Sequence, residues 1–185
     1  MVAWERIWLN VVVGSALFGT RARKQLLRIA RIHGAAPIGG GRGVWMQPGV
    51  HWGGSRDVTF GDRVYVNTGV VFDACAPIRI EDDVHVAHGV KILTATHEVG
   101  AGNKRAGEMI YGPIRLSAGA WIGANAVILP GVTVGEGCVV AAGSVVSRDC
   151  EPHGFYGGAP ATRLRDLPSP EAGLEQAEAT SRRDQ

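Results

Sequence analysis

The imidazole of His97 is the side chain of this sequence best placed for proton transfer. Histidine has an unperturbed pKa of about 6.5, so it can remove a proton from a hydroxyl group near neutral pH. His97 stands where a run of regularly spaced apolar residues breaks off into a long polar segment, residues 97–113. His85 and His88 occupy outward positions within that run and are interpreted as surface residues. The remaining three of the six histidines lie in connecting segments: His33, His51 and His153.

Several other side chains are of types that suit ligand binding. Glu98 directly follows His97 and could orient its ring, or it could simply be an exposed carboxylate. Trp121 on its own indicates packing or an interface more than a ligand contact. Three arginines gather near the end of the repeat, where they suit a phosphate or pyrophosphate group or are merely solvated: Arg148, Arg163 and Arg165.

The apolar residues around this polar segment recur with a period of six. The large ones are Leu116, Ile122, Ile128, Val134, Val140 and Val146, and the small ones that accompany them are Ala120, Ala126, Val132, Cys138 and Ser144. Such a period fits neither an α-helix nor a simple alternating strand. One large and one small inward residue in every six are typical of flat coils that turn and stack on one another. The pattern therefore predicts a parallel β-helix. Gly123, Asn125 and Gly135 lie near the bends and tolerate the positive φ that such corners often need.

The composition predicts a globular protein without a nucleic-acid partner. Lys and Arg number 19 against 17 Asp and Glu, which gives a formal net charge of +2, and 45% of the residues are hydrophobic. The three cysteines, Cys75, Cys138 and Cys150, form no CxxC pair, and their odd number predicts a reducing compartment, the cytoplasm. The most apolar N-terminal stretch, residues 7–18, is shorter than the roughly 20 residues that a membrane span needs.

The chain divides into four regions that differ in composition and in the pattern of apolar residues. They are an N-terminal helical segment and lead-in (1–43), the repeat (44–150), a turn and short helix (151–167) and a polar tail that we expect to be disordered (168–185). Within the first region, residues 21–32 (RARKQLLRIARI) have the pattern of a basic amphipathic helix. Such a helix can lie on an anionic membrane surface, or it can cover the end of the main domain.

Four motifs in a fixed order resemble one family of enzymes. They are THEVG (96–100), AWIGANAVILPGVTVG (120–135), AAGSVVSRD (141–149) and GGAPATRLR (157–165). Together they are similar to the hexapeptide-repeat acyltransferases, and most of all to the branch that O-acetylates galactosides, maltose and nodulation factors. The resemblance implies a mainly β fold, a left-handed parallel β-helix of hexapeptide repeats with an N-terminal helical segment and a short C-terminal helix. It also implies a homotrimer that binds acetyl-CoA in clefts between neighbouring subunits.

The resemblance also implies roles for particular residues. His97 occupies the position of the catalytic histidine, and Asn67 matches the asparagine that lines the acceptor pocket. Asp73 lies near the place of an acidic residue of that pocket, although the local spacing differs. Trp121, Ala124 and Ala142 match contacts to the pantetheine arm of CoA. Ser147, Arg148 and Arg165 match positions near its nucleotide end. Where many relatives carry a basic residue after the GxPA turn, this chain has Thr162, and Arg163 follows one place later.

These residues predict an acetyl-CoA-dependent O-acetyltransferase whose acceptor is a hydroxyl of a sugar or similar polyol. His97 would act as the general base, with direct transfer in a ternary complex, and residues 97–113 would form the acceptor loop with Glu98 beside the substrate. One alternative is a non-catalytic hexapeptide scaffold that binds a partner or, through residues 21–32, a membrane surface. The other is a protein like the γ-class carbonic anhydrases, which bind zinc through three histidines. This chain has no HxxxxH pair, and we therefore predict no metal.

Overall fold

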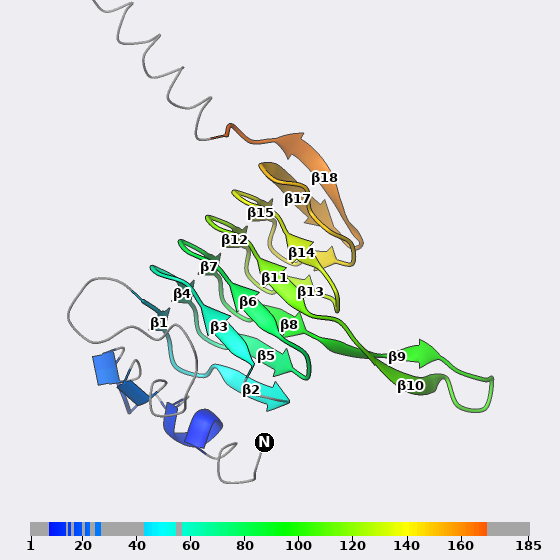
Figure 1. Cartoon of the computed structure of the whole chain (residues 1–185), viewed down its shortest axis with the longest axis horizontal. Helices are drawn as coiled ribbons and strands as arrows, with labels where there is room; N and C mark the ends of the chain where they lie inside the picture. The colour runs from blue at the N-terminus through cyan, green and yellow to red at the C-terminus, as the bar shows by residue number, and fades with distance from the viewer. Residues whose placement is uncertain are drawn as a thin grey trace, which may run out of the picture.

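The main body of the molecule is a parallel β-solenoid (Figure 1). The structure is a computed structural model that describes residues 8–13, 15, 17–19, 21–22, 25–26, 43–54 and 57–169. On each coil the chain runs through a first, a second and a third face before it begins the next coil. The fold is mainly β, with helix only near the N-terminus of the described residues, and this agrees with the left-handed β-helix predicted above.

Each face is one sheet whose strands stack in register. The first face contains β1 (Trp45–Met46), β4 (Tyr65–Val66), β7 (His85–Val86), β12 (Trp121–Ile122), β15 (Val139–Val140), β17 (Gly154–Gly158) and β18 (Ala161–Asp166). The second contains β2 (His51–Gly54), β5 (Val71–Ala74), β8 (Lys91–Leu93), β13 (Val127–Ile128) and β16 (Val145–Val146). The third contains β3 (Val58–Phe60), β6 (Ile78–Ile80), β11 (Ile114–Leu116) and β14 (Thr133–Val134).

The interior of the solenoid is filled by the residues of the six-residue period. The six large and five small residues predicted to point inward are each 2% exposed or less. They form one continuous core with their counterparts on the earlier coils. The period therefore predicts correctly which side chains are buried.

Two different constraints select the residues at the corners: a positive φ and the close approach of the next coil. Asn125 has φ 59°, as the sequence predicts for a bend. Gly123 and Gly135 do not have positive φ; a Cβ at Gly123 would lie 2.6 Å from the backbone N of Ala142, and one at Gly135 would lie 2.5 Å from the carbonyl oxygen of Cys150. These two glycines are required because the next coil passes too close for any side chain.

The polar segment predicted as a loop is a β-hairpin that extends away from the coils (Figure 1). It consists of β9 (Ala95–Val99) and β10 (Ala106–Tyr111), which pair antiparallel with His97 opposite Met109. The hairpin interrupts the solenoid between β8 and β11, and its side chains are largely exposed. It therefore carries His97 outward on ordered backbone.

The short C-terminal helix predicted for residues 151–167 is wrong. The chain instead forms the hairpin of β17 and β18, and β17 pairs parallel with β15. Gly158 has φ 102° in the turn of this hairpin. The edge of β15 pairs with β17, and β17 in turn pairs with β18. These tertiary pairings outweigh the local helical preference of residues 161–166.

The N-terminal segment covers the open edge of the solenoid. In η1 (Trp8–Val13), the side chain of Asn10 donates from Nδ2 to the carbonyl oxygen of Trp52 at 3.0 Å. Its Oδ1 accepts from the Trp52 N–H at 2.7 Å. β2 is the edge strand of the second face, so the amide of Asn10 replaces the neighbouring strand that β2 lacks.

Parts of both terminal regions lie outside the described residues. Of the amphipathic helix predicted at 21–32, residues 21–22 and 25–26 are helical, and Leu26 packs against the core. The rest of that helix, and residues 170–185 of the predicted tail, are not described. Among the described residues, no helix has the length and apolar character needed to cross a membrane.

Replacing Asn10 with alanine should lower the free energy of unfolding by about 1–3 kcal/mol, because the peptide groups of Trp52 lose both partners at a partly buried edge. Urea denaturation would measure the change. Val11→Ala is the control, since Val11 is 61% exposed and its replacement should change stability by less than about 0.5 kcal/mol. Equal effects of the two substitutions would show that the amide of Asn10 does not hold this edge.

Candidate active site

Asn67 lies at the corner that joins the first face to the second. Its N–H donates to the carbonyl oxygen of Val86 on the next coil at 2.9 Å, and its side-chain Oδ1 accepts from the Thr68 N–H at 2.8 Å. Ala124 and Ala142 follow β12 and β15 at the same corner, on later coils. The structure thus brings together, along one edge, three residues that the sequence assigns to one binding site.

Trp121 stands beside this corner on the outer surface of the first face. Its side chain is 55% exposed, and β12 places it between His85 and Val139 in register. One coil further away, the ring of Tyr65 stacks on that of His85 with centroids 5.7 Å apart. The first face therefore offers an exposed row of rings that ends at Trp121, next to Ala124.

His97 is held by the hairpin in a defined orientation. Its Nδ1 lies 2.9 Å from the carbonyl oxygen of Gly107 on β10. A carbonyl oxygen can only accept, so Nδ1 carries the hydrogen and Nε2 keeps a free lone pair in the neutral ring. The arrangement gives His97 the tautomer that a general base needs.

The partner of His97 is thus a backbone carbonyl, and Glu98 is not needed for its orientation. Neighbouring residues of a strand point to opposite sides, so Glu98 on β9 faces away from the His97 ring. Gly107 could not be identified from residue types, because its contribution is a carbonyl oxygen. A Cβ at this position would lie 3.0 Å from the carbonyl oxygen of Glu98, so a glycine allows the two strands to approach.

Within one chain, His97 is far from Asn67. The hairpin leaves the coil after Thr94, at the corner that joins the second face to the third, whereas Asn67 lies at the opposite end of the second face. The longest strands of that face have 4 residues, which span about 13 Å at about 3.3 Å per residue. The three residues that lead from Thr94 to His97 extend away from the solenoid (Figure 1). A site that contains both residues therefore needs a second copy of the chain.

Asp73 shares the corner of the hairpin. It lies on β5, half-buried, and its backbone carbonyl accepts from the N–H of Thr94 at 3.1 Å. The thiol of Cys75 donates to its Oδ1 at 3.4 Å. Asp73 is thus on the side of His97 and away from Asn67 of the same chain.

The predicted nucleotide-binding residues lie on different faces. Ser147 and Arg148 are exposed after β16, at the end of the second face, while Arg165 lies on β18 in the sheet of the first face. The guanidinium carbon of Arg165 is 4.9 Å from the centroid of the Phe155 ring. The structure therefore does not join these three residues into one cluster within a chain.

Comparison with known proteins places this fold in a family. Residues 113–148 match the family model described as "Bacterial transferase hexapeptide (six repeats)". The structure of a hexapeptide-repeat-containing acetyltransferase from Vibrio cholerae, complexed with acetyl coenzyme A, is 33% identical, with a TM-score of 0.77 and coverage of 90% of this chain and 88% of that one. The chain belongs to the hexapeptide-repeat acetyltransferase family.

Two further members of the family have named activities. Galactoside O-acetyltransferase of Escherichia coli (strain K12) is 31% identical over 69% of this chain and 63% of its own length. The structure of a maltose O-acetyltransferase from Clostridium difficile 630 is 25% identical, with a TM-score of 0.73 and coverage of 90% and 88%. The chain spans between 54% and 63% of the length of the first curated relatives that it matches.

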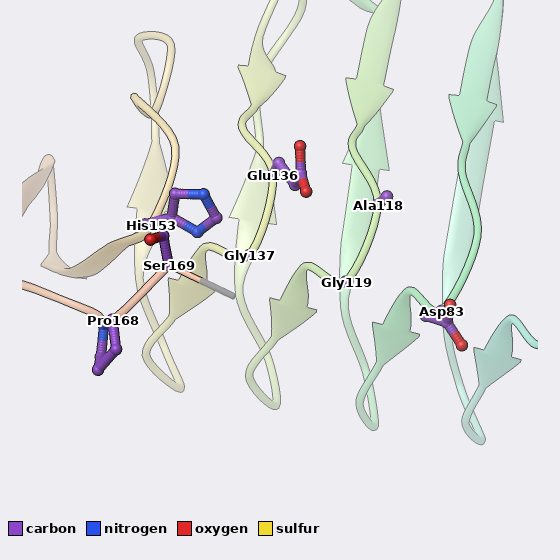
Figure 2. A pocket seen from close by; sticks show the side chains of 8 residues that line it. All are labelled: Asp83, Ala118, Gly119, Glu136, Gly137, His153, Pro168 and Ser169. Carbon is purple, nitrogen blue, oxygen red and sulfur yellow. The ribbon is translucent and has the colours of Figure 1, made fainter. Parts of the chain in front are cut away.

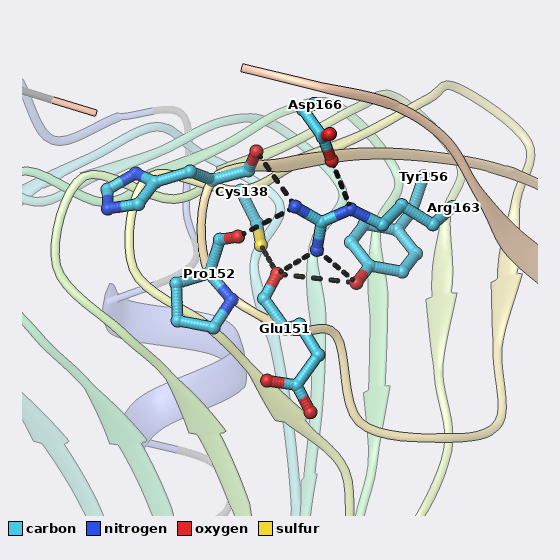
Figure 3. A network of polar contacts seen from close by, with 7 residues as sticks. Cys138, Glu151, Pro152, Tyr156, Arg163 and Asp166 are labelled. Atoms are coloured by element: carbon cyan, nitrogen blue, oxygen red, sulfur yellow. Dashed lines mark hydrogen bonds and ion pairs between the residues drawn. The ribbon is translucent and has the colours of Figure 1, made fainter. Parts of the chain in front are cut away.

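Arg163 has a structural task in this family member (Figure 3). Its guanidinium donates to the carbonyl oxygens of Glu151 and Pro152 at 3.2 and 3.1 Å, and to that of His153 at 3.3 Å. It also donates to the hydroxyl of Tyr156 at 3.1 Å and to the carboxylate of Asp166 at 2.8 Å. The bonds to Asp166 and Tyr156 raise the pKa of Arg163, which therefore stays charged. Its donors are fully used in closing the last coil and are not available to a phosphate.

The buried cysteines are poor nucleophiles. Burial raises the pKa of the Cys138 thiol and raises that of Cys150 to about 12. The Cys138 thiol donates to the carbonyl oxygen of Glu151 at 3.0 Å. Both groups are protonated near neutral pH, and a thiol attacks a thioester far more slowly than a thiolate does.

A cavity of about 440 Å³ lies at the remaining corner, between the third face and the first (Figure 2). Figure 2 shows Glu136, His153 and Asp83 around it, with Pro168 and Ser169 crossing from the C-terminal side. It contains none of the residues that the sequence assigns to catalysis or to CoA. In the described part of the chain, no three His, Cys, Asp or Glu side chains are grouped as metal ligands would be.

Replacing Arg163 with alanine should lower the melting temperature by more than Arg165→Ala does, because Arg163 satisfies three backbone carbonyls and Arg165 contacts only one ring face in the described structure. Arg163→Lys should restore the melting temperature only in part, since an ammonium group cannot reproduce the planar fork of a guanidinium. Calorimetry of the three variants checks this. A full rescue by lysine would mean that charge alone, and not this set of hydrogen bonds, closes the last coil.

Proposed function

We propose that this protein transfers an acetyl group from acetyl-CoA to a hydroxyl of a sugar or similar polyol. The observation that carries the proposal is the bond between His97 Nδ1 and the Gly107 carbonyl, which leaves Nε2 as a free base on an exposed arm. Membership of the hexapeptide-repeat acetyltransferases supports the acyl donor, because a relative was solved with acetyl coenzyme A. The names of the galactoside and maltose enzymes support a sugar-like acceptor.

The reaction requires two substrates side by side. Nε2 of His97 removes the proton of the acceptor hydroxyl while that oxygen attacks the thioester carbonyl carbon. A backbone N–H on the wall of the cleft stabilises the oxyanion that develops on the carbonyl. The C–S bond then breaks, and the imidazolium of His97 returns the proton to the sulfur of CoA. The acetyl group passes directly from CoA to the acceptor, in accord with the protonated state of the buried thiols.

The site is formed between two copies of the chain in a homotrimer. The hairpin of one copy would bring His97 to the corner of the next, where Asn67, Trp121 and Ala124 lie. Asp73 of the same copy as the hairpin, on β5 beside its base, would face that corner. Asn67 and Asp73 would hold the acceptor from opposite sides. Glu98 would contact only a part of the acceptor that extends past the hairpin, because its side chain faces away from the His97 ring. The pantetheine arm of CoA would run along the corner past Trp121, Ala124 and Ala142, with Ser147, Arg148 and Arg165 near the nucleotide.

Cysteines that form no disulfide fit a reducing compartment, and we place the reaction in the cytoplasm. In the described part of the chain, Cys75, Cys138 and Cys150 form no disulfide. A peripheral membrane contact through residues 21–32 would bring the site close to a lipid-linked acceptor. Binding of the full chain to anionic vesicles tests that part of the proposal separately.

His97→Ala should lower kcat by about 10²–10⁴-fold, the usual contribution of a positioned general base. The affinity for acetyl-CoA should remain close to that of the wild type, since the imidazole meets the reacting atoms and not the nucleotide. Release of free thiol in the presence of a panel of sugars measures kcat, and titration calorimetry measures binding. His153→Asn is the matched control, because His153 lies at another corner and asparagine tolerates its φ of 52°. Near-normal turnover of His97→Ala, or an isolable acetylated protein, would overturn this mechanism.

Mixing His97→Ala with Asn67→Ala, after dissociation and reassembly, should restore activity to two inactive proteins. In randomly mixed trimers, about a quarter of the sites combine an intact His97 with an intact Asn67 from the neighbour. Light scattering should show a particle of about three times 19.5 kDa. A monomer, or trimers that mix without any recovery, would contradict a site between copies.

A further inference from the structure

His88 occupies a corner position between two parts of the proposed site. The corner residues of successive coils stack through backbone hydrogen bonds. Gly89 N–H donates to the carbonyl oxygen of Thr68 at 3.0 Å, and Asn125 N–H donates to that of His88 at 2.8 Å. Gly143 N–H donates to that of Ala124 at 2.8 Å. The corner thus runs from Thr68 through His88 and Ala124 to Ala142, with about 4.8 Å between coils.

The side chain of His88 is exposed at this corner. Its ring forms no hydrogen bond or ion pair with the part of the chain that the structure describes. The corner residues directly before and after it in the stack, Thr68 and Ala124, carry no charge, and the closest ionisable residues along the chain are His85 and Lys91. These features agree with the interpretation of His88 as a surface residue from its outward position in the repeat.

The stacking order gives His88 a more specific position. In the proposed function, Ala142 and Ala124 contact the pantetheine arm of CoA, while Asn67, next to Thr68, positions the acceptor. The arm descends the corner by one coil from Ala142 to Ala124. Its sulfur end must then approach the coil between Ala124 and Asn67, and the corner residue of that coil is His88.

We propose that an imidazole N–H of His88 donates a hydrogen bond to the sulfur of CoA as it becomes a thiolate. This inference rests on the proposed function. The acceptor oxygen forms its bond to the carbonyl carbon, the C–S bond breaks, and its electron pair goes to the sulfur. The proton released by the hydroxyl is held by His97 and ends on that sulfur. His88 loses no proton; it stabilises the negative charge on the leaving group until the proton arrives.

The contact predicts a difference between CoA and desulfo-CoA, which lacks the thiol. At pH 9, where much of a thiol population is ionised, wild-type protein should bind CoA about tenfold or more tightly than desulfo-CoA, the usual effect of a charge-assisted hydrogen bond. In His88→Ala the two dissociation constants should become nearly equal. His88→Gln keeps an N–H donor and should retain part of the difference, while His153→Asn should retain all of it.

Turnover gives an independent readout. His88→Ala should lower kcat by about 10- to 100-fold with little change in the KM for acetyl-CoA, because the sulfur carries charge only in the transition state. The proposal is overturned if the ratio of the dissociation constants is the same in His88→Ala and wild type, even if kcat falls. If wild type binds both CoA and desulfo-CoA and acetylates sugars, that result leaves the proposed function intact. If wild type binds neither ligand, the proposed function and the role of His88 both fail.

Discussion

The backbone hydrogen bonds between successive coils are the interaction on which the rest of this structure depends. Strands of only two to four residues cannot form a stable sheet alone, yet in the interior of the solenoid the backbone of each such strand pairs with the coil before and with the coil after it. This pairing forces the coils into register, so that residues one coil apart lie directly above one another. A position within the coil therefore determines whether a side chain enters the core, a face or a corner.

The same register limits what a single chain can build. Residues at the same corner of successive coils become neighbours, as His88 and Ala124 do, whereas residues at different corners stay separated by the width of a face. The interior of the solenoid is occupied by one continuous hydrophobic core, so binding groups lie on its outer faces and corners. Chemistry that needs residues from two corners therefore requires either a projecting arm or a second copy, and this protein has an arm whose base lies opposite Asn67.

The sequence predicts those features that residue types and their spacing determine directly, and it does not predict those that depend on the position of the backbone. The inward residues are predictable, because the period of six identifies them directly. The position of His97 is predictable as the point where this period stops. The contact with the Gly107 carbonyl is not predictable, since every residue type has a backbone carbonyl. The C-terminal helix was predicted wrongly, because residues 161–166 have a strand partner only after the solenoid has formed. Arg163 belonged to an apparent arginine cluster, and only the positions of three backbone carbonyls show its structural task.

The carbonyl that orients His97 has a consequence for the proton that this residue carries. A carboxylate in the same place would form an ion pair with the imidazolium and stabilise it electrostatically. The carbonyl of Gly107 fixes the tautomer and the direction of the ring but bears no net charge. In the proposed mechanism, an imidazolium formed at His97 would therefore have a neutral dipole beside Nδ1 and not an opposite charge. The direct transfer that we propose would suit such a base, because the proton must leave it again within the same catalytic cycle, and a backbone partner on the paired hairpin provides orientation without adding a charge.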